Sequence, residues 1–149
     1  MFDRLSTAER SAHMRRIRKV DTKPELAVRR TAHRLGYRFR LHRRDLPGTP
    51  DLVFPRLRKV IFVHGCFWHQ HACSLGSKKP STNTDYWLPK LARNVERDRV
   101  ARKQIVDKGW KVLVVWECQT RRLQTLEYIL AGFLSSSSHT RGLDFPRHP

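Results

Sequence analysis

The segment from His64 to Cys73 concentrates side chains that bind metal ions. It holds two cysteines and three histidines within ten residues, and the third cysteine of the chain lies far downstream. Three thiolates and one imidazole suit a structural Zn²⁺ ion, which prefers four such ligands in a tetrahedral arrangement. The alternative is a solvated histidine-rich loop, with the downstream cysteine buried as an ordinary thiol. The zinc hypothesis takes as ligands Cys66, His71, Cys73 and Cys118.

Two large aromatic residues, Phe67 and Trp68, lie in the same segment. Aromatic side chains at the tip of a metal-pinned loop are suited to insertion between base pairs, which they unstack. Core packing is the alternative, because burial is the commonest fate of such side chains. Trp87 presents the same choice between a contact to nucleic acid and anchoring of a helix on a sheet.

Acidic residues are scarce in this chain, so those at inward-facing positions are candidates for chemistry. Asp51 follows a Pro-Gly-Thr-Pro loop and begins an apolar run, a place where metal ligands often lie, although turns also favour aspartate. Glu25 shares a predicted helix face with Val28 and Ala32. It also holds the third position of a capping box, and capping alone can explain it.

Asp98 lies where the next inward residue of a long predicted helix belongs. The apolar stripe of that helix consists of Leu88, Leu91, Val95 and Ile105. An inward carboxylate needs a partner or a role in proton transfer, because burial of an unpaired charge is costly. Pairing with nearby arginines on an exposed face is the alternative.

These carboxylates and the histidines of the loop form a predicted polar cluster next to the zinc site. Hydrolysis of a phosphodiester needs Mg²⁺ to offset the charge of the phosphate and a base to activate water. An aspartate with a strand-edge carbonyl and nearby histidines can supply both. We therefore expect a catalytic magnesium beside a structural zinc, in a cluster of Glu25, Asp51, His64, His69 and Asp98.

The composition favours a folded protein that binds nucleic acid. The 149 residues include 31 Lys and Arg against 13 Asp and Glu, a formal net charge of +18, which attracts polyanions. Hydrophobic residues make up 39% of the chain, enough for a packed core, and this excludes a wholly disordered polycation. The sequence has no apolar run that could span a bilayer and no signal-peptide core. We expect a cytoplasmic, nucleoid-associated protein with no membrane partner.

The elements that must position these residues follow from capping signals and hydrophobic periodicity. Capping boxes predict helices over about 6–19 and 22–35, and Gly36 ends the second. The remaining predicted elements are strands over 37–41, 51–54, 59–64 and 110–116 and helices over 85–108 and 122–134, with a hairpin between the second and third strands. This order predicts an α/β fold with a mixed central sheet flanked by helices. We expect one domain over 1–134 and a disordered tail over 135–149.

Several ordered segments resemble one family of nucleases. They are Leu46-Pro47-Gly48-x-Pro50-Asp51, Val60-Ile61-Phe62 followed by His64-Gly65-Cys66-Phe67-Trp68-His69, and Asn94-Val95-Glu96-Arg97-Asp98 followed by Val115-Trp116-Glu117-Cys118. From about Ser11 to Gln119 the chain resembles the very-short-patch-repair (Vsr) DNA mismatch endonucleases. The resemblance implies a PD-(D/E)xK restriction-endonuclease-like fold with a structural zinc site. It also implies Mg²⁺-dependent nicking of one strand 5′ of the thymine in T:G mispairs left by deamination of 5-methylcytosine.

The resemblance further implies a role for each matching residue. Asp51 and the backbone carbonyl of Val63 would bind Mg²⁺, and His69 would activate water as general base. The residues that orient metal-bound waters and this base would be Glu25, His64 and Asp98. The zinc ligands would be Cys66, His71, Cys73 and Cys118. The residues inserted into the duplex would be Phe67, Trp68 and Trp87, with Met14 on an N-terminal helix that lies across the minor groove.

The chain departs from the patterns of these nucleases at a few positions. The lysine usual in PD-(D/E)xK nucleases is absent, as in the Vsr family, so catalysis would depend on His69 rather than on an ammonium group. Val63 stands where some relatives have threonine, which is tolerable if only its carbonyl binds metal. Thr49 stands where some relatives have arginine, so a DNA contact from this position is not implied.

The resemblance implies a monomer that acts on double-stranded DNA containing a T:G mispair. A cytosine-5 DNA methyltransferase would be its functional partner, with mismatch-repair proteins as further partners. Two alternatives remain open from the sequence. One is a PD-(D/E)xK nuclease without mismatch preference, and the other is a non-catalytic, zinc-containing DNA-binding protein in which the acids only cap helices or lie on the surface.

Overall fold

Among the described residues, the central sheet has four strands in the order β1-β2-β3-β4. The computed structural model describes residues 21–74, 76–77 and 83–136. β1 and β2 are antiparallel, as are β2 and β3, whereas β3 and β4 are parallel. The predicted mixed sheet and the predicted hairpin are therefore confirmed. The strands are β1 (Arg40–Leu41), β2 (Leu52–Phe54), β3 (Lys59–His64) and β4 (Lys111–Trp116).

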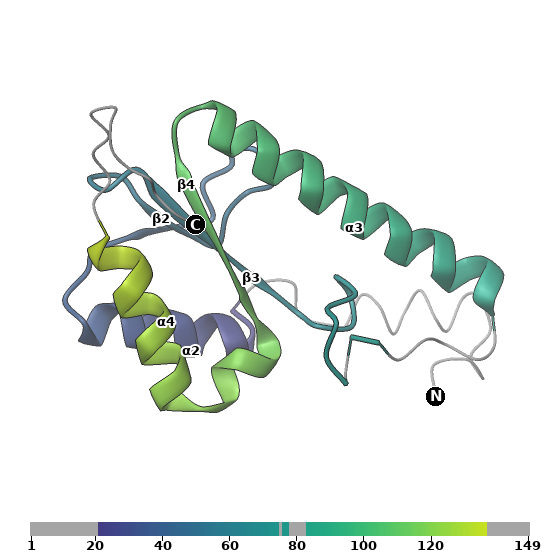
Figure 1. Cartoon of the computed structure of the whole chain (residues 1–149). Coiled ribbons are helices and arrows are strands. Elements are labelled where there is room, and N and C mark those ends of the chain that lie inside the picture. The colour runs from purple at the N-terminus through teal and green to yellow at the C-terminus, as the bar shows by residue number, and fades with distance from the viewer. Residues whose placement is uncertain (1–20, 75, 78–82, 137–149) are drawn as a thin grey trace.

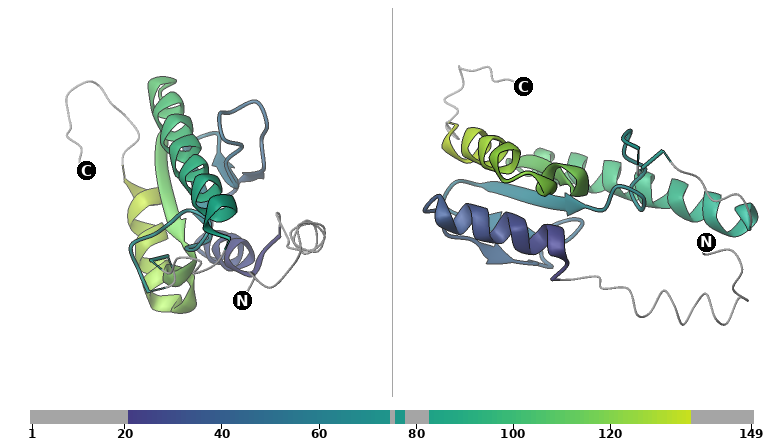
Figure 2. Two further views of the ribbon diagram at one scale, coloured as in Figure 1. Left: turned by 90° about the vertical axis from the view of Figure 1, so that its right-hand side faces the viewer. Right: turned by 90° about the horizontal axis from the view of Figure 1, so that it is seen from below.

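Helices cover both faces of the sheet (Figures 1 and 2). They are α2 (Lys23–Arg34), α3 (Thr84–Asp107), the short helix η2 (Glu117–Arg121) and α4 (Leu123–Ser135). The alternation of strand side chains explains the layers. Leu52 and Phe54 of β2 belong to the core beneath α2 and α4, whereas Val53 between them belongs to the core beneath α3. Every helix in the described part of the chain falls short of the length and apolarity that a membrane span requires.

Most predicted boundaries are correct to within one or two residues, and the first predicted strand is the exception. Only Arg40–Leu41 of the predicted 37–41 strand pairs with β2. In this register residues 37 and 38 would face Arg56 and Pro55, which belong to the turn after β2, so the pairing does not extend to the start of the predicted strand. Tyr37 and Phe39 instead pack edge-on against Phe54, with ring centroids 6.5 Å and 5.8 Å from it. The predicted helix over 6–19 and most of the predicted tail lie outside the described residues.

Gly36 ends α2 as the sequence predicts. Its φ of +93° is open to glycine and strained for other residues. The Gly36 N–H donates to the carbonyl of His33 at 2.9 Å, and the Tyr37 N–H donates to the carbonyl of Ala32 at 3.1 Å. These two bonds form a Schellman motif, which satisfies the last carbonyls of the helix and turns the chain toward β1.

The inner face of α3 differs from the predicted apolar stripe. Leu91 and Ile105 are buried, but Leu88 and Val95 are 44% and 42% exposed. The inward positions are instead 87, 91, 94, 98, 101 and 105, a spacing of alternately four and three residues. The Asn94 side-chain amide accordingly donates to the Trp68 carbonyl at 3.1 Å. Asp98 therefore faces inward, as expected, although two of the four stripe residues are wrong.

Two glycines of this fold give a matched test of the Gly36 cap. A Cβ at position 36 or 132 would meet no atom within 4 Å, so a substitution by alanine changes only backbone preference. Gly36→Ala should lower the free energy of unfolding by about 1–2 kcal/mol because of its positive φ. Gly132→Ala lies within α4 and should raise it by about 0.5–1 kcal/mol. Urea unfolding of both variants measures these changes. Equal changes in the free energy of unfolding at positions 36 and 132 would contradict the assigned cap.

Candidate active site and metal cluster

The antiparallel hairpin brings the start of β2 beside the end of β3. The Val63 backbone N–H there donates to Asp51 Oδ2 at 2.6 Å. A cavity of about 400 Å³ opens at this edge of the sheet. Its wall contains three carboxylates and two imidazoles, which come from α2, the edge of the sheet, the following loop and α3. They are Glu25, Asp51, Asp98, His64 and His69.

One side of this edge holds Glu25, His42 and Asp51, whose ligand atoms lie within 4.8 Å of one another. The His42 Nε2 atom is 3.4 Å from Glu25 Oε1 and 3.8 Å from Asp51 Oδ1. Glu25 is 4% exposed, and it also accepts hydrogen bonds from Arg29 Nη2 at 3.2 Å and from the Asp21 N–H at 3.0 Å. Glu25 therefore occupies a capping position at the start of α2 and also faces inward.

Sequence reasoning did not identify His42. It follows the predicted first strand, precedes two arginines and matches no ligand spacing. The contact depends on tertiary structure, because the His42 N–H donates to the Asp51 carbonyl at 3.3 Å. A φ of +47° at His42 directs the chain there, and no local sequence signal predicts that angle.

Burial dominates the electrostatics of Asp51. Together with the negative charge of Glu25, burial raises the pKa of the Asp51 carboxyl to about 6, against the opposing effects of the Val63 N–H, His42 and His69. A desolvated carboxylate beside a second carboxylate is stabilised by a nearby cation. Oxygen ligands of this kind suit a hard divalent ion such as Mg²⁺. The donor set thus fits the metal that the sequence predicts at Asp51.

The other side of the cavity holds His64, His69 and Asp98. The two imidazoles stack with centroids 3.8 Å apart, and His69 Nδ1 is hydrogen-bonded to Asp98 Oδ2. Burial, with smaller contributions from His69 and Arg102, lowers the pKa of His64 to about 4 against the opposing effect of Asp98. His64 is therefore neutral at about pH 7. The Nδ1 atom of His69 faces Asp98 Oδ2, so a proton on Nδ1 would be held by that carboxylate and Nε2 would be able to accept another.

Gly48 allows the loop before Asp51 to approach α3. A Cβ at this position would lie 2.7 Å from the Ala101 Cβ and 3.1 Å from the Phe62 ring, and φ is +73°. A larger residue would push the loop away from α3. Glycine thus fixes how closely Asp51 lies to the side chains that α3 contributes.

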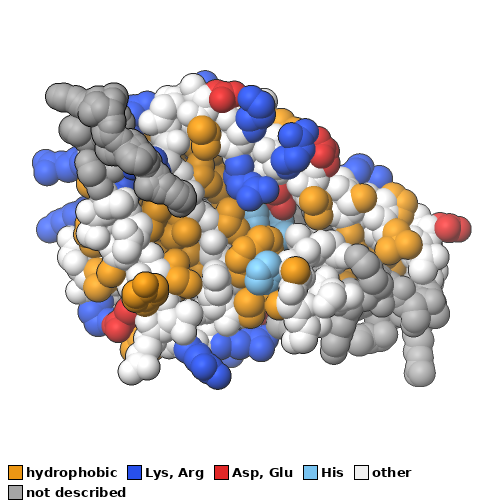
Figure 3. Space-filling model, in the orientation of Figure 1, with side chains coloured by type: hydrophobic (Ala, Val, Ile, Leu, Met, Phe, Trp, Pro, Cys, Tyr) orange, Lys and Arg blue, Asp and Glu red, His pale blue; other side chains and the backbone are white. Residues whose placement is uncertain are grey.

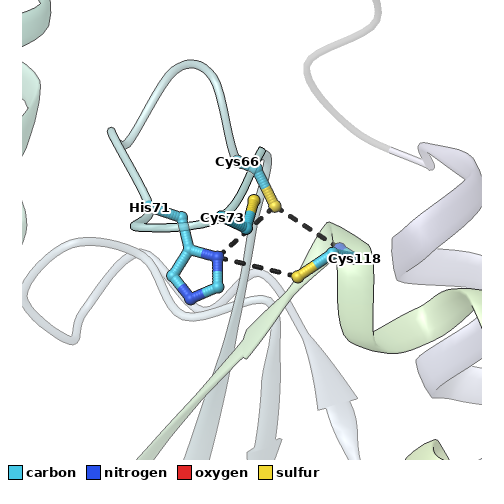
Figure 4. Close-up of side chains that lie close together, drawn as sticks. All are labelled: Cys66, His71, Cys73 and Cys118. Carbon is cyan, nitrogen blue, oxygen red and sulfur yellow. Dashed lines mark hydrogen bonds between the residues drawn. The ribbon is translucent and has the colours of Figure 1, made fainter. Parts of the chain in front are cut away.

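The predicted zinc ligands lie together at the same edge of the sheet (Figure 4). His71 Nδ1 is 3.7 Å from Cys66 Sγ and 3.6 Å from Cys118 Sγ. In tetrahedral Zn²⁺ sites, bonds of about 2.3 Å to sulfur and 2.0 Å to nitrogen place such ligands about 3.6 Å apart. The fourth member of the group is Cys73, and all four ligand atoms lie within 4.8 Å of one another. The donor set and its spacing therefore fit zinc.

Neighbouring groups hold this metal cluster in place. The Glu117 carboxylate accepts a hydrogen bond from the Cys66 N–H at 3.2 Å, and the His71 ring stacks on Trp116 at 4.1 Å. Burial raises the pKa of the Cys66 thiol to about 12, so this thiol keeps its proton unless a cation replaces it. Metal binding at such a site is coupled to proton release and to folding.

The predicted aromatic residues form one cluster next to the metal cluster. Trp87 has no exposed surface, and its ring lies 6.3 Å from Phe67 and 5.9 Å from Trp68. Phe67 and Trp68 are partly exposed. Trp87 is thus buried against the two loop aromatics in this conformation.

Cationic side chains border the cavity. Arg97 and Arg102 of α3 belong to its wall, and Arg102 Nε donates to the Asp98 carbonyl at 3.3 Å. Figure 3 shows histidine side chains near the middle of this face, with Lys and Arg side chains above them. A phosphate at the cavity would meet positive charge at its rim and metal-binding groups inside.

Comparison with known proteins identifies the family. The family model described as DNA mismatch endonuclease Vsr matches residues 2–75. The DNA mismatch endonuclease Vsr of Escherichia coli K12 is 44% identical over 126 residues, which cover 85% of this chain and 80% of that protein. The chain belongs to the Vsr family of DNA mismatch endonucleases. The type II nicking enzyme V.XorIIP of Xanthomonas oryzae pv. oryzae is 50% identical over 137 residues, 92% of this chain and 100% of that protein. V.NmeAIP of Neisseria meningitidis, also a type II nicking enzyme, is 40% identical over 121 residues, 81% of this chain and 86% of that protein.

Membership of the Vsr family confirms the predicted family and the predicted endonuclease activity. A non-catalytic DNA-binding protein is therefore not supported. The structure brings all five predicted polar residues to one cavity and all four predicted zinc ligands to one cluster. Their individual roles in this Vsr-family enzyme stay predictions, and His42 is the addition that the structure makes.

The raised pKa of Asp51 predicts a stability cost in the metal-free Vsr-family enzyme. A folded pKa of about 6 lies above the usual 3.8, so the native state binds the extra proton and stability falls as the pH rises from about 4 to 6. Asp51→Asn removes this charge and should raise the free energy of unfolding at about pH 7 by roughly 2–3 kcal/mol.

Urea unfolding against pH in the presence of a chelator of magnesium measures this effect. Asp107→Asn, at an exposed aspartate on α3, is the matched control and should leave the pH profile unchanged. A wild-type stability that rises from pH 4 to 6, with no gain in Asp51→Asn, would contradict the assigned desolvation.

Proposed function

We propose that this Vsr-family endonuclease nicks one DNA strand 5′ of the thymine in T:G mispairs that arise by deamination of 5-methylcytosine, and so initiates very short patch repair. The observation that carries the proposal is the single cavity in which Asp51 faces the His69–Asp98 pair. The name and the 44% identity of the Escherichia coli relative support the mismatch as substrate. The net charge of +18 suits a DNA backbone.

Asp51 and the backbone carbonyl of Val63 are the proposed magnesium ligands. The N–H and C=O of one residue in an antiparallel strand point to the same neighbour, so the Val63 carbonyl faces the side on which its N–H meets Asp51. Bound Mg²⁺ would offset negative charge on the scissile phosphate. An aspartate at the start of one strand facing the end of the next also fits the proposed PD-(D/E)xK-like fold, with His64 near the place of the missing lysine.

His69 is the proposed general base. Asp98 orients its ring and stabilises the imidazolium that forms when Nε2 takes a proton from water. The stacked His64 stays neutral, so it adds no charge against that proton. Glu25, held by Arg29 and His42, is the proposed acceptor of hydrogen bonds from metal-bound water.

We propose that the metal cluster holds a structural zinc ion and that the aromatic cluster contacts the duplex. Zinc would fix the loop that carries both the base His69 and the partly exposed Phe67 and Trp68. These two rings are the proposed wedge beside the mispair, supported by Trp87. Met14 lies outside the described residues and is the proposed contact from the N-terminal helix. The endonuclease unit is proposed to be one domain over 1–134.

The proposed partners follow from the substrate. Deamination of 5-methylcytosine requires a cytosine-5 methyltransferase to have acted on the same site, so the two enzymes would share a recognition sequence. Mismatch-repair proteins are proposed to act at the same lesions, and the enzyme is proposed to work as a monomer on double-stranded DNA.

A panel of end-labelled duplexes tests the substrate. Duplexes with T:G, C:G or T:A at the central pair of several methylation-site sequences are incubated with the enzyme and Mg²⁺. We expect a single nick 5′ of the mispaired thymine and none in its matched counterparts. Equal cutting of matched and mispaired duplexes would establish instead a nuclease without mismatch preference.

The role of His69 predicts a defect in cleavage and not in binding. His69→Ala should slow single-turnover nicking by about 10²- to 10⁴-fold, because general-base catalysis contributes that much. Its affinity for the same duplex, measured without Mg²⁺, should stay within about threefold of wild type. Tyr128→Ala, at an exposed residue of α4, is the control, and a nicking rate for His69→Ala equal to that of this control would exclude the base assignment.

The zinc hypothesis predicts metal content and stability together. The purified enzyme should carry one zinc ion per chain by atomic emission, and Cys118→Ser should lose it. The variant should also unfold at a lower temperature, because the metal joins the end of β4 to the loop after β3. If zinc-free wild-type protein melted at the same temperature as the zinc-loaded protein, the cluster would not be a structural metal site.

A further inference from the structure

A second groove lies along the free edge of the sheet, apart from the catalytic cavity. It has a volume of about 940 Å³ and is formed by the segment through β1 and by the turn between β2 and β3. Its floor includes Tyr37, Phe39 and Leu57, which pack against the core beneath α2 and α4. We call it the arginine groove because its wall also contains Arg38, Arg40, Arg43 and Arg56.

Most of these arginines have no acidic partner among the described residues. Arg38, Arg40 and Arg56 are exposed and belong to no ion pair there, whereas Arg43 pairs with Asp45 at 2.6 Å. The wall of the arginine groove contains no aspartate or glutamate. Packing of Tyr37 and Phe39 on Phe54 directs the alternate residues of this segment outward, so the positive charge is fixed in place by the core.

A neighbouring hollow extends the positive surface. It has a volume of about 530 Å³, shares Phe39 with the arginine groove and is lined otherwise by Arg29, Arg30, His33 and Arg34 of α2. Arg30 is exposed and continues the cationic surface onto α2, whereas Arg29 pairs with Asp21 and Glu25 and Arg34 pairs with Glu127. Repulsion among the cationic side chains is offset when a polyanion binds, and an extended row of arginines matches the regular spacing of phosphates.

The arginine groove begins next to the catalytic cavity. Leu41 belongs to its wall, and the following residue, His42, lies 3.8 Å from Asp51 Oδ1. The four residue steps from Leu41 back to Tyr37 span about 13 Å along an extended chain. This length corresponds to roughly four base pairs at about 3.4 Å each.

We propose that the arginine groove binds the sugar-phosphate backbone of the duplex on one flank of the nicking site. The inference rests on the cleavage of DNA by this family and not on the proposed preference for T:G. It adds a docking surface to the enzyme at the sheet edge, separate from the aromatic cluster. The contact is to phosphates, so it strengthens binding without reading sequence.

The test compares Arg38→Ala/Arg40→Ala/Arg56→Ala with the charge-preserving Arg38→Lys/Arg40→Lys/Arg56→Lys. Dissociation constants are measured against salt on a long duplex, with and without the T:G mispair, and on two duplexes each shortened on one flank. The alanine variant should bind the long duplex about 10- to 100-fold more weakly near 0.1 M salt, with a salt slope reduced by about 2–3. The lysine variant should keep the wild-type slope.

Two further results belong to the proposal. Shortening one flank of the duplex should lower the affinity of the wild-type enzyme to that of the alanine variant, and shortening the other flank should not. Single-turnover nicking by saturating alanine variant should match wild type, which separates docking from catalysis. Duplexes without a mispair are included, so the contribution of the arginine groove to affinity can be measured even if the enzyme shows no preference for T:G.

An unchanged affinity and salt slope in the alanine variant, with a wild-type melting temperature, would overturn the proposal. The arginine groove would then be available to an acidic protein instead of DNA. A fall in affinity on both shortened duplexes that equals the fall on the long one would also overturn it, because the arginines would then act through overall charge rather than by contact with one flank.

Discussion

The parallel, in-register pairing of β3 with β4 determines where the chemistry of this protein lies. His64 at the end of β3 is paired with Trp116 at the end of β4, so the residues that follow both strands leave the sheet side by side. Cys66 and Cys118 each lie two residues further and meet at His71. The loop between His64 and Cys73 is thereby tied down and presents His69 to Asp98. A shift of register would separate both groups at once.

The second constraint is electrostatic. A chain with 13 acidic residues and a net charge of +18 places three of its carboxylates around one cavity, and one of them is desolvated enough to have a pKa of about 6. Such an arrangement opposes stability in the absence of a cation, and it repels a phosphate unless a cation lies between them. Arginines at the rim and carboxylates inside the cavity together fit the binding and cleavage of a phosphodiester in the presence of metal.

Sequence patterns predicted the elements well where local rules act. The Gly36 stop, the hairpin and the strand before Cys118 all follow from capping, turn and periodicity signals. The α3 stripe was wrong at Leu88 and Val95, because a helix that overhangs the sheet leaves apolar residues exposed. His42 was missed because its place depends on a positive φ and on the pairing of β1 with β2, which no local pattern encodes. The family resemblance supplied the roles of residues that spacing alone left open.

The central claim is that Asp51 captures a divalent ion at the cavity while His69 takes no part in that capture. Binding of Mn²⁺, followed by electron paramagnetic resonance on the complex of enzyme and T:G duplex, tests it most directly. The complex formed by His69→Ala should bind Mn²⁺ as tightly as the wild-type complex, and the complex formed by Asp51→Asn should lose at least one bound ion. Retention of every ion by Asp51→Asn would contradict the account.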